Sequence, residues 1–353
     1  MTGPRTAALA GWLAALALVL AACGSSSSPS HAPAAAPSGA ASAAGARDAD
    51  LSGVTLRVGQ TGWAQFKAAL QVAGLDHTPY RIKWAVFPGG DKQLQALQAG
   101  ALDVAQTSDI PPVFAAAATT PKWRVVAVQR AATLQQNVVA AKGSGITGIA
   151  GLKGKKVGYV QATTAQFFLY KLLVQNGLTW NDIHAVPLTP QDGVAALSSG
   201  SIDALATYGN SVVTTVRQGA TVIGSGQDIL SGNFPWEAST DVVADPARSA
   251  ALVDLLARVN KAYVFIRDGH EEELAKIDAQ DTDQPQSQAL EQIRANEQQI
   301  PTAVRPGGAA QIAKEQDVAD TFSRLGVLPG KVDVASYWSD ALSARLTGAL
   351  GTS

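Results

Sequence analysis

The stretch Leu94–Pro112 reads LQALQAGALDVAQTSDIPP. A similar stretch, Val194–Val212, lies one hundred residues later and reads VAALSSGSIDALATYGNSV. In both stretches an amphipathic run precedes a glycine, a short apolar run and a polar loop, which predicts a helix, a turn, a buried strand and a loop at a sheet edge. The matched pairs are Leu97 and Leu197, Gly100 and Gly200, Asp103 and Asp203, and Thr107 and Thr207.

The glycines and aspartates of the two copies have local structural reasons. Gly100 and Gly200 each end a helical run at the position where a left-handed conformation is needed, and glycine adopts that conformation at little cost. The polar residues that follow each strand then lie at the carboxyl edge of a sheet, where open α/β sheets bind ligands. Asp103 and Asp203 are interpreted as structural carboxylates that bond to backbone rather than as a catalytic pair.

The repeat extends upstream, because Val58-Gly59 has a counterpart in Val157-Gly158. A period near one hundred residues is too long for a solenoid, so the pattern predicts two similar α/β lobes. We place the first lobe at 51–135 and 240–353 and the second at 136–239. The chain is predicted to return to the first lobe through a strand at Ser239–Ala244, and the helix-rich tail is predicted to cover that lobe.

The first 50 residues have the features of a targeting signal and a membrane attachment, and they are not predicted to form part of the folded lobes. Arg5 precedes an apolar run, Ala7–Leu20, which is typical of a signal peptide. Leu20–Cys23 has the form of a lipobox, in which the thiol of Cys23 accepts a diacylglycerol, so 1–23 is interpreted as a lipoprotein signal peptide. Residues 24–50 lack aromatic and large aliphatic side chains and are predicted to be a disordered tether. The expected location is the outer face of the cytoplasmic membrane or the periplasm, with a lipid anchor.

Composition argues against several classes of function. The chain has 27 basic and 28 acidic residues with no basic stripe, which argues against nucleic acid as a partner. His77, His184 and His270 lack the spacing of metal ligands, and no nucleophile elbow of the G-x-S-x-G type occurs between a predicted strand and helix. We therefore expect a monomeric binding protein, with no catalytic residues, no metal and no cofactor.

Polar loops at predicted strand ends and helix starts form the candidate binding site. A helix N-terminus offers free N–H groups and the positive end of its dipole to an anion. Asp91 has an alternative role as the cap of its own helix, and Trp63 is either a core aromatic or a wall of the cleft. The candidate ligand-binding residues are Gln60, Thr61, Gly62, Trp63, Gly89, Gly90, Asp91, Thr107, Ser108, Asp109, Gln161, Thr163, Thr164, Tyr208, Asn210 and Trp236.

Several of these stretches resemble a known family. Phe87–Asp103 followed by Thr107–Pro112, Leu152–Val157 and Leu325–Pro329 are similar to the aliphatic sulfonate binding proteins of ABC transporters, in the sulfonate, taurine and nitrate group. The resemblance implies a two-lobed type 2 periplasmic-binding-protein fold of the α/β class, with a hinge that closes on an oxyanion and an ABC permease as partner. It places ligand loops at 60–63, 89–91, 107–109 and 161–164.

One loop departs from the family pattern. Relatives usually carry Trp-Asp-Pro where this chain has Tyr208-Gly209-Asn210. The family carboxylate is thus replaced by an amide, and a ligand with a cationic amine, such as taurine, is expected to lose a partner there. Besides a sulfonate, the alternatives are nitrate, taurine, a thiamine-precursor pyrimidine, an enzyme on the same fold, or a sensor lipoprotein with no transport role.

Overall fold

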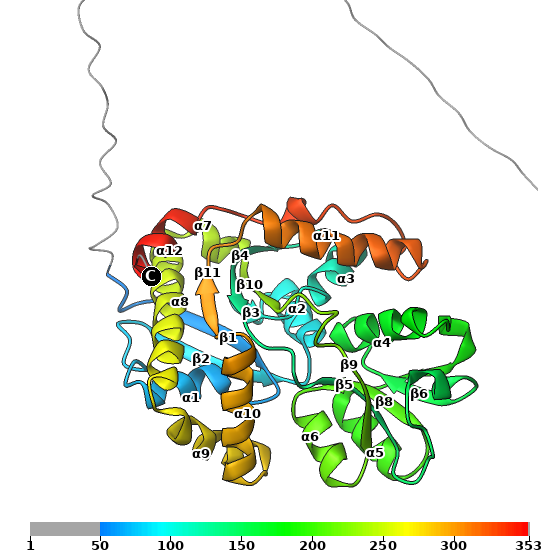
Figure 1. The fold of residues 1–353 in the computed structure, drawn as a ribbon. Coiled ribbons are helices and arrows are strands. Elements are labelled where there is room, and N and C mark those ends of the chain that lie inside the picture. The colour runs from blue at the N-terminus through cyan, green and yellow to red at the C-terminus, as the bar shows by residue number, and fades with distance from the viewer. Residues whose placement is uncertain (1–49, 352–353) are drawn as a thin grey trace, which may run out of the picture. The chain divides into compact units, whose positions relative to one another are not determined.

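The computed structural model describes residues 50–351. The predicted signal peptide, Cys23 and nearly all of the predicted tether lie outside the described residues. Within 50–351, no helix is long and apolar enough to cross a membrane. The described chain forms two β-sheets flanked by helices (Figure 1).

The first sheet has six strands in the order β11-β4-β10-β3-β1-β2. The strands β1, β2 and β3 pair in parallel, whereas β10 is antiparallel to both of its neighbours and β11 is antiparallel to β4. Parallel β1–β2–β3 units joined by helices are typical of α/β folds. The strands are β1 Thr55–Thr61, β2 Arg81–Phe87, β3 Val104–Gln106, β4 Trp123–Arg130, β10 Asn233–Ser239 and β11 Ala303–Arg305.

The second sheet repeats the arrangement of the first, in the order β7-β6-β8-β5-β9. Here β6 lies in parallel between β7 and β8, as β1 lies between β2 and β3, and the antiparallel strand β5 pairs with β8 as β10 pairs with β3. The predicted internal repeat is therefore present in the topology. The strands are β5 Gln136–Ala140, β6 Lys156–Tyr159, β7 His184–Pro187, β8 Ala204–Tyr208 and β9 Thr221–Ser225.

The matched residues of the repeat have the predicted structural roles. Gly100 and Gly200 both adopt a φ of +74° after their helices, which only glycine adopts without strain. A carboxylate oxygen of Asp103 accepts a 2.8 Å hydrogen bond from the backbone N–H of Arg57, and Asp203 accepts one of the same length from the N–H of Lys156. Each aspartate therefore ties the start of its strand to the adjacent parallel strand.

Short helices connect the strands of each sheet, and longer ones follow in the C-terminal part. Buried leucines of α8 pack in one cluster with Leu56 of β1 and with Phe66 and Trp236, so this helix covers the first sheet (Figure 1). The α-helices are α1 Gln65–Val72, α2 Gly90–Gln98, α3 Pro111–Ala118, α4 Thr164–Gln175, α5 Pro190–Ser198, α6 Asn210–Arg217, α7 Thr240–Ala244, α8 Pro246–Arg267, α9 Glu271–Thr282, α10 Gln286–Gln299, α11 Ala309–Arg324 and α12 Ser343–Leu350.

The strand that returns to the first sheet lies earlier than the sequence predicted. Residues 240–244 form the helix α7, whose N-terminus is capped by Ser239 through a 3.2 Å bond from the N–H of Val242 to its hydroxyl. The returning strand is β10, and Pro235 within it obscured the pattern, since proline is rare in central strands. Pro235 is accommodated because its carbonyl still accepts a 3.1 Å bond from the N–H of Thr107 and the strand bulges after Trp236. Residues 233–239 thus belong to the first sheet, whereas the predicted division assigned them to the second lobe.

Two segments, 131–135 and 226–232, connect the two sheets. The first joins β4 to β5 and the second joins β9 to β10. They lie side by side, because the N–H of Ala131 donates to the carbonyl of Gly232 at 3.1 Å. The chain therefore crosses between the two α/β units twice, through two connecting segments that lie next to each other.

Candidate functional site

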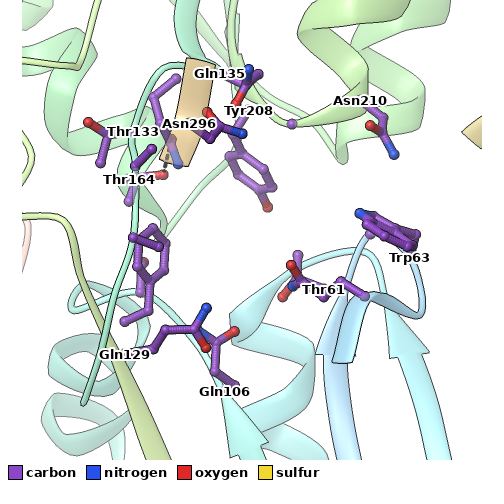
Figure 2. Close-up of a pocket in the computed structure, with 18 of the residues that line it drawn as sticks. Thr61, Trp63, Gln106, Gln129, Thr133, Gln135, Thr164, Tyr208, Asn210 and Asn296 are labelled. Atoms are coloured by element: carbon purple, nitrogen blue, oxygen red, sulfur yellow. Dashed lines mark hydrogen bonds between the residues drawn. The ribbon is translucent and has the colours of Figure 1, made fainter. Parts of the chain in front are cut away.

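A cavity of about 360 Å³ is bounded by residues from both sheets and from the C-terminal helices. Thr61 ends β1, Gln106 ends β3 with Thr107 directly after it, and Tyr208 ends β8, so the cavity lies at the carboxyl ends of the parallel strands. Figure 2 shows Thr61, Gln106 and Tyr208 around one open space. This is the position at which α/β sheets bind ligands.

Six helices begin at this cavity. Their first residues, which all line it, are Gln65, Gly90, Pro111, Thr164, Pro190 and Asn210. Each of these helices has at least eight residues. The N-terminal N–H groups of a helix have no partner within the helix, and its dipole places partial positive charge there. The cavity therefore collects positive potential from backbone rather than from side chains.

The start of α4 is held in an unusual conformation. Ala162 has a φ of +57°, which is uncommon for a residue with a Cβ. Its N–H donates to the side-chain oxygen of Gln166 at 2.9 Å, and the hydroxyl of Thr163 donates to the carbonyl of Val160 at 2.7 Å. Backbone strain of this kind persists where the surroundings enforce it and is concentrated at functional sites. The hydroxyl of Thr164 lines the cavity and donates to the amide oxygen of Gln136 at 2.6 Å.

A buried glutamine that the sequence analysis missed positions the first-sheet side of the cavity. The amide nitrogen of Gln93 donates to the hydroxyl of Thr61 at 2.7 Å and to the carbonyl of Gln106 at 2.9 Å. Its oxygen accepts from the N–H of Gln106 at 3.2 Å. A Cβ on Gly59 would lie 2.5 Å from that oxygen, so glycine is required there. Gln93 lies inside the predicted helix, where no sequence signal separates it from its surface neighbours.

Close packing joins the loops that face each other across the cavity. A Cβ on Gly90 would lie 2.9 Å from the Cβ of Thr107, so α2 approaches the end of β3 as closely as a glycine permits. The hydroxyl of Tyr208, from the second sheet, donates to the carbonyl of Pro88 at 3.4 Å. Trp63 is partly buried; it lines the cavity and also packs against the first core cluster, so both of its predicted environments apply.

Of the candidate residues, Thr61, Gly62, Trp63, Gly90, Thr107, Ser108, Thr163, Thr164, Tyr208 and Asn210 line the cavity. Trp236 is placed differently: it is fully buried in the central strand β10, with its ring centroid 4.8 Å from that of Phe66. Because its strand runs through the middle of the sheet, its side chain faces the core instead of the cleft. The remaining candidates outside the lining are Gln60, Gly89, Asp91, Asp109 and Gln161.

Those remaining polar residues mostly support the loops. The oxygen of Gln60 accepts a 2.8 Å bond from the N–H of Phe66 and so fixes the start of α1. Asp91 pairs with the ammonium of Lys92 at 3.4 Å. Asp109 is buried and accepts a hydrogen bond from the hydroxyl of Ser231, and burial raises its pKa to about 6. Gln161 is exposed to solvent.

Buried carboxylates lie behind the loop that follows β3. An oxygen of Glu237 lies 2.6 Å from the hydroxyl of Thr107, and burial raises the pKa of Glu237 well above its usual range. Glu315 accepts 2.8 Å hydrogen bonds from the hydroxyl of Tyr337 and the ring N–H of Trp338. Burial, with a smaller contribution from the charge of Asp109, raises the pKa of Glu315 to about 8. Both glutamates are therefore favoured as neutral acids in the folded protein.

The charged groups of the cavity are acidic. None of the described residues that line it is Lys, Arg or His, and the two carboxylates among them, Asp278 and Glu297, come from α9 and α10. Glu297 forms a 3.0 Å ion pair with Arg267. Neither Asp278 nor Glu297 carries a sequence signal of a site, because both lie in amphipathic helices of the C-terminal part that contain no copy of the repeat.

Comparison with known proteins gives the same relationship that the motifs indicated. Residues 83–227 match the family model described as NMT1/THI5 like. A protein of Escherichia coli named putative aliphatic sulfonates-binding protein is 30% identical over 256 residues, covering 72% of this chain and 78% of the relative. The chain belongs to the family of that protein.

Solved structures confirm the fold predicted for this family. The alkanesulfonate-binding protein SsuA of Xanthomonas axonopodis pv. citri, solved bound to MOPS, is 26% identical, with a TM-score of 0.71 over 81% of this chain and 98% of that one. The two-lobed periplasmic-binding-protein fold is thus present here. The desulfurization enzyme DSZB, at 15% identity and a TM-score of 0.60 over 84% of this chain and 98% of that one, shares the fold alone.

Proposed function

We propose that this chain is the substrate-binding component of an ABC importer and that it captures an organic sulfonate between its two lobes and delivers it to the permease. The observation that carries the proposal is the convergence of six helix N-termini on one cavity between the sheets. The names of the relatives support the same ligand class. In this interpretation the chain acts by binding and not as an enzyme.

The sulfonate group is assigned to the helix starts and adjacent hydroxyls. Gly90 and Thr164 offer backbone N–H groups, and Ser108 offers a hydroxyl, at the edges of the two sheets. Hydrogen bonds to a charged group contribute about 1.5–3 kcal/mol each. Because a sulfonate remains ionised at any physiological pH, it does not need a proton from the protein. Neutral donors fixed by the fold are therefore sufficient to hold it.

The organic part of the ligand is assigned to the apolar portion of the same cavity. Trp63, Phe234, Ile266, Leu274 and Ile293 contribute apolar lining. Burying apolar surface contributes about 25 cal/mol per Å². Bare sulfate and nitrate have no such surface, so an alkanesulfonate should bind more tightly than either inorganic anion.

Calorimetric titration with 1-propanesulfonate, sulfate, nitrate and a thiamine-precursor pyrimidine tests the proposal. The expected order places the propanesulfonate first. Tighter binding of nitrate or of the pyrimidine would assign the site to a different ligand, and binding of none of the four would contradict a transport receptor of this class. The melting temperature of the ligand-free protein, measured in each buffer, serves as the folding control and should be the same in all of them.

We further propose that Cys23 carries a lipid that holds the protein at the outer face of the membrane. The support for this is the lipobox form of Leu20–Cys23. A diacyl anchor is a two-chain attachment of the kind that holds stably. Cys23→Ser should therefore move the protein from the membrane fraction to the soluble fraction, and a variant that still sediments with membranes would refute the anchor.

A further inference from the structure

A second cavity, which we call the α4–α11 pocket, lies where α4 of the second α/β unit meets α11, which packs on the first. Its volume is about 260 Å³, and it shares none of its described lining residues with the proposed sulfonate cavity. The two helices are in contact beside it. The ring centroids of Phe167 and Phe322 are 5.6 Å apart, and the ammonium of Lys171 lies 3.4 Å from the hydroxyl of Thr321. The pocket is therefore a separate cavity whose walls come from both units.

Three aromatic side chains form walls of the α4–α11 pocket. Tyr170 lies on α4, Phe322 lies on α11, and Trp180 begins a short 3-10 helix after α4. Other rings hold two of these walls in place. Phe114 meets Phe322 edge to face with centroids 4.9 Å apart, and Tyr159 meets Trp180 in the same way at 5.0 Å. Fixed aromatic walls of this kind favour a ligand that presents the face or edge of its own ring.

One largely buried side chain of the pocket has a hydrogen-bond donor that the protein does not use. Gln166, on α4, lines the pocket and is only 6% exposed. Its oxygen accepts a 2.9 Å bond from the N–H of Ala162, which sets the orientation of the amide. The nitrogen of the same amide has no acceptor among the described residues. Such a group in a native protein calls for a partner from outside the chain.

We propose that the α4–α11 pocket is a second ligand site, and that it binds a small neutral aromatic molecule with one hydrogen-bond acceptor. The aromatic walls contact the ring, and the amide nitrogen of Gln166 donates to the acceptor. None of the described residues that line the pocket is charged, so nothing in it pairs with an ionised group. Sites for drug-sized ligands span roughly 300–1,000 Å³, so this smaller pocket suits a single ring with a short substituent. A helix of a partner protein, about 10 Å across, is too wide for it.

The two cavities lie along one helix without overlapping. Thr164, at the start of α4, lines the proposed sulfonate cavity, whereas Gln166 and Tyr170 line the α4–α11 pocket. At 1.5 Å per residue, Tyr170 lies about 9 Å further along the helix than Thr164. A ligand in one cavity therefore leaves room for a ligand in the other, and the second site does not depend on which anion the first one takes.

The test is an NMR titration with acetophenone and with ethylbenzene, which has a methylene group in place of the carbonyl acceptor. The wild type should bind acetophenone, and saturating 1-propanesulfonate should not displace it. Trp180→Ala removes one wall and should weaken acetophenone binding about fivefold or more. Trp84→Ala removes another partly buried tryptophan, outside both cavities, and should leave the affinity unchanged. Gln166→Met keeps an unbranched side chain of similar size without the donor. It should weaken acetophenone about threefold to tenfold more than it weakens ethylbenzene.

The opposite results overturn the site. Absence of acetophenone binding, equal losses in Trp180→Ala and Trp84→Ala, or displacement by 1-propanesulfonate would show that the pocket is not where the aromatic molecule binds. Equal losses of both probes in Gln166→Met would refute the donor role of that amide. If 1-propanesulfonate itself does not bind, the two tryptophan variants still decide, so this result is distinguishable from a failure of the proposed function. If Trp180→Ala does not fold, Tyr170→Ala removes another partly buried wall and must show the same loss.

Discussion

Replacing Glu315 with glutamine should make the protein more resistant to alkaline pH. Glu315, on α11, is 1% exposed, and its two oxygens lie 2.8 Å from the Tyr337 hydroxyl and from the Trp338 ring nitrogen. Burial raises its pKa from 4.5 to about 8. An acid whose pKa is raised by folding contributes stability below its unfolded pKa, and that stability is lost as the pH rises through the folded pKa. The window for Glu315 therefore runs from about pH 4.5 to about pH 8.

The size of the effect follows from the pKa difference. At about 1.4 kcal/mol per pKa unit, the ionisation of Glu315 removes about 5 kcal/mol of stability in total, and about 3 kcal/mol of this is lost between about pH 6 and about pH 9. Glutamine has no such titration. Its carbonyl can accept from the Trp338 ring N–H, and its amide can donate to the Tyr337 hydroxyl, so the hydrogen-bond geometry is retained.

The assay is urea unfolding of the wild type and Glu315→Gln at about pH 6 and about pH 9. The free energy of unfolding of the wild type should fall by about 3 kcal/mol more than that of the variant across this interval. Glu291→Gln, at an exposed position on α10, is the matched control and should follow the wild type. Parallel losses of stability in the wild type and Glu315→Gln would refute the assignment of the alkaline decline to this glutamate.

Three further predictions concern the cavity. Ser108→Ala removes a cavity hydroxyl in the loop after β3 and should weaken propanesulfonate binding about tenfold in calorimetry without a loss of fold; unchanged affinity would exclude Ser108 from the site. Gly90→Ala places a methyl group 2.9 Å from Thr107 and should lower the free energy of unfolding by about 1–3 kcal/mol, whereas Gly330→Ala, with no atom within 4 Å, should be nearly neutral; equal effects would contradict the packing argument. Saturating ligand should reduce the radius of gyration in small-angle scattering if the lobes rotate about 131–135 and 226–232, and an unchanged value would contradict closure.

The two-sheet architecture was predictable because it is repeated. Each copy places a helix, a glycine and a buried strand in the same order, and a match at constant spacing is far more informative than one local pattern. The predicted structural role of the two aspartates is confirmed, because Asp103 and Asp203 accept equivalent backbone hydrogen bonds. The repeat also identified loops at helix starts, such as 89–91 and 161–164, as the place to search for an anion site.

Residues 233–239 were misassigned because strand prediction depends on local signals. Pro235 suggested a loop, whereas the bulge after Trp236 and the pairing of β10 with β3 and β4 are properties of the assembled sheet. Trp236 was expected at the cleft for the same reason: an aromatic residue in an apparent loop suggests a surface role. Once the segment is a central strand, Trp236 lies in its middle, where its side chain packs against Phe66 in the first core cluster.

Asp278 and Gln129 could not be selected from the sequence because their environment depends on tertiary contacts. Asp278 lies in a helix rich in Asp and Glu, and acids in such runs are usually solvated. Only the packing of α9 against α10 and α1 buries its carboxylate beside the cavity. Gln129 lies in a buried strand, and only the folded structure shows that its side chain lines the same cavity.

The proposed anion site has no basic side chain among its described lining residues, and this imposes a condition on the acids behind it. Glu237 lies against Thr107 in the loop that lines the cavity, and Glu315 lies in the same buried region. Were both ionised, their negative charge would oppose the partial positive charge of the helix starts. Burial keeps them protonated instead, so they fix the loop through hydrogen bonds without adding charge. A rise in pH that ionises Glu237 and Glu315 should therefore have two effects. It should destabilise the fold, and it should weaken the positive potential of the helix starts that is proposed to hold a sulfonate.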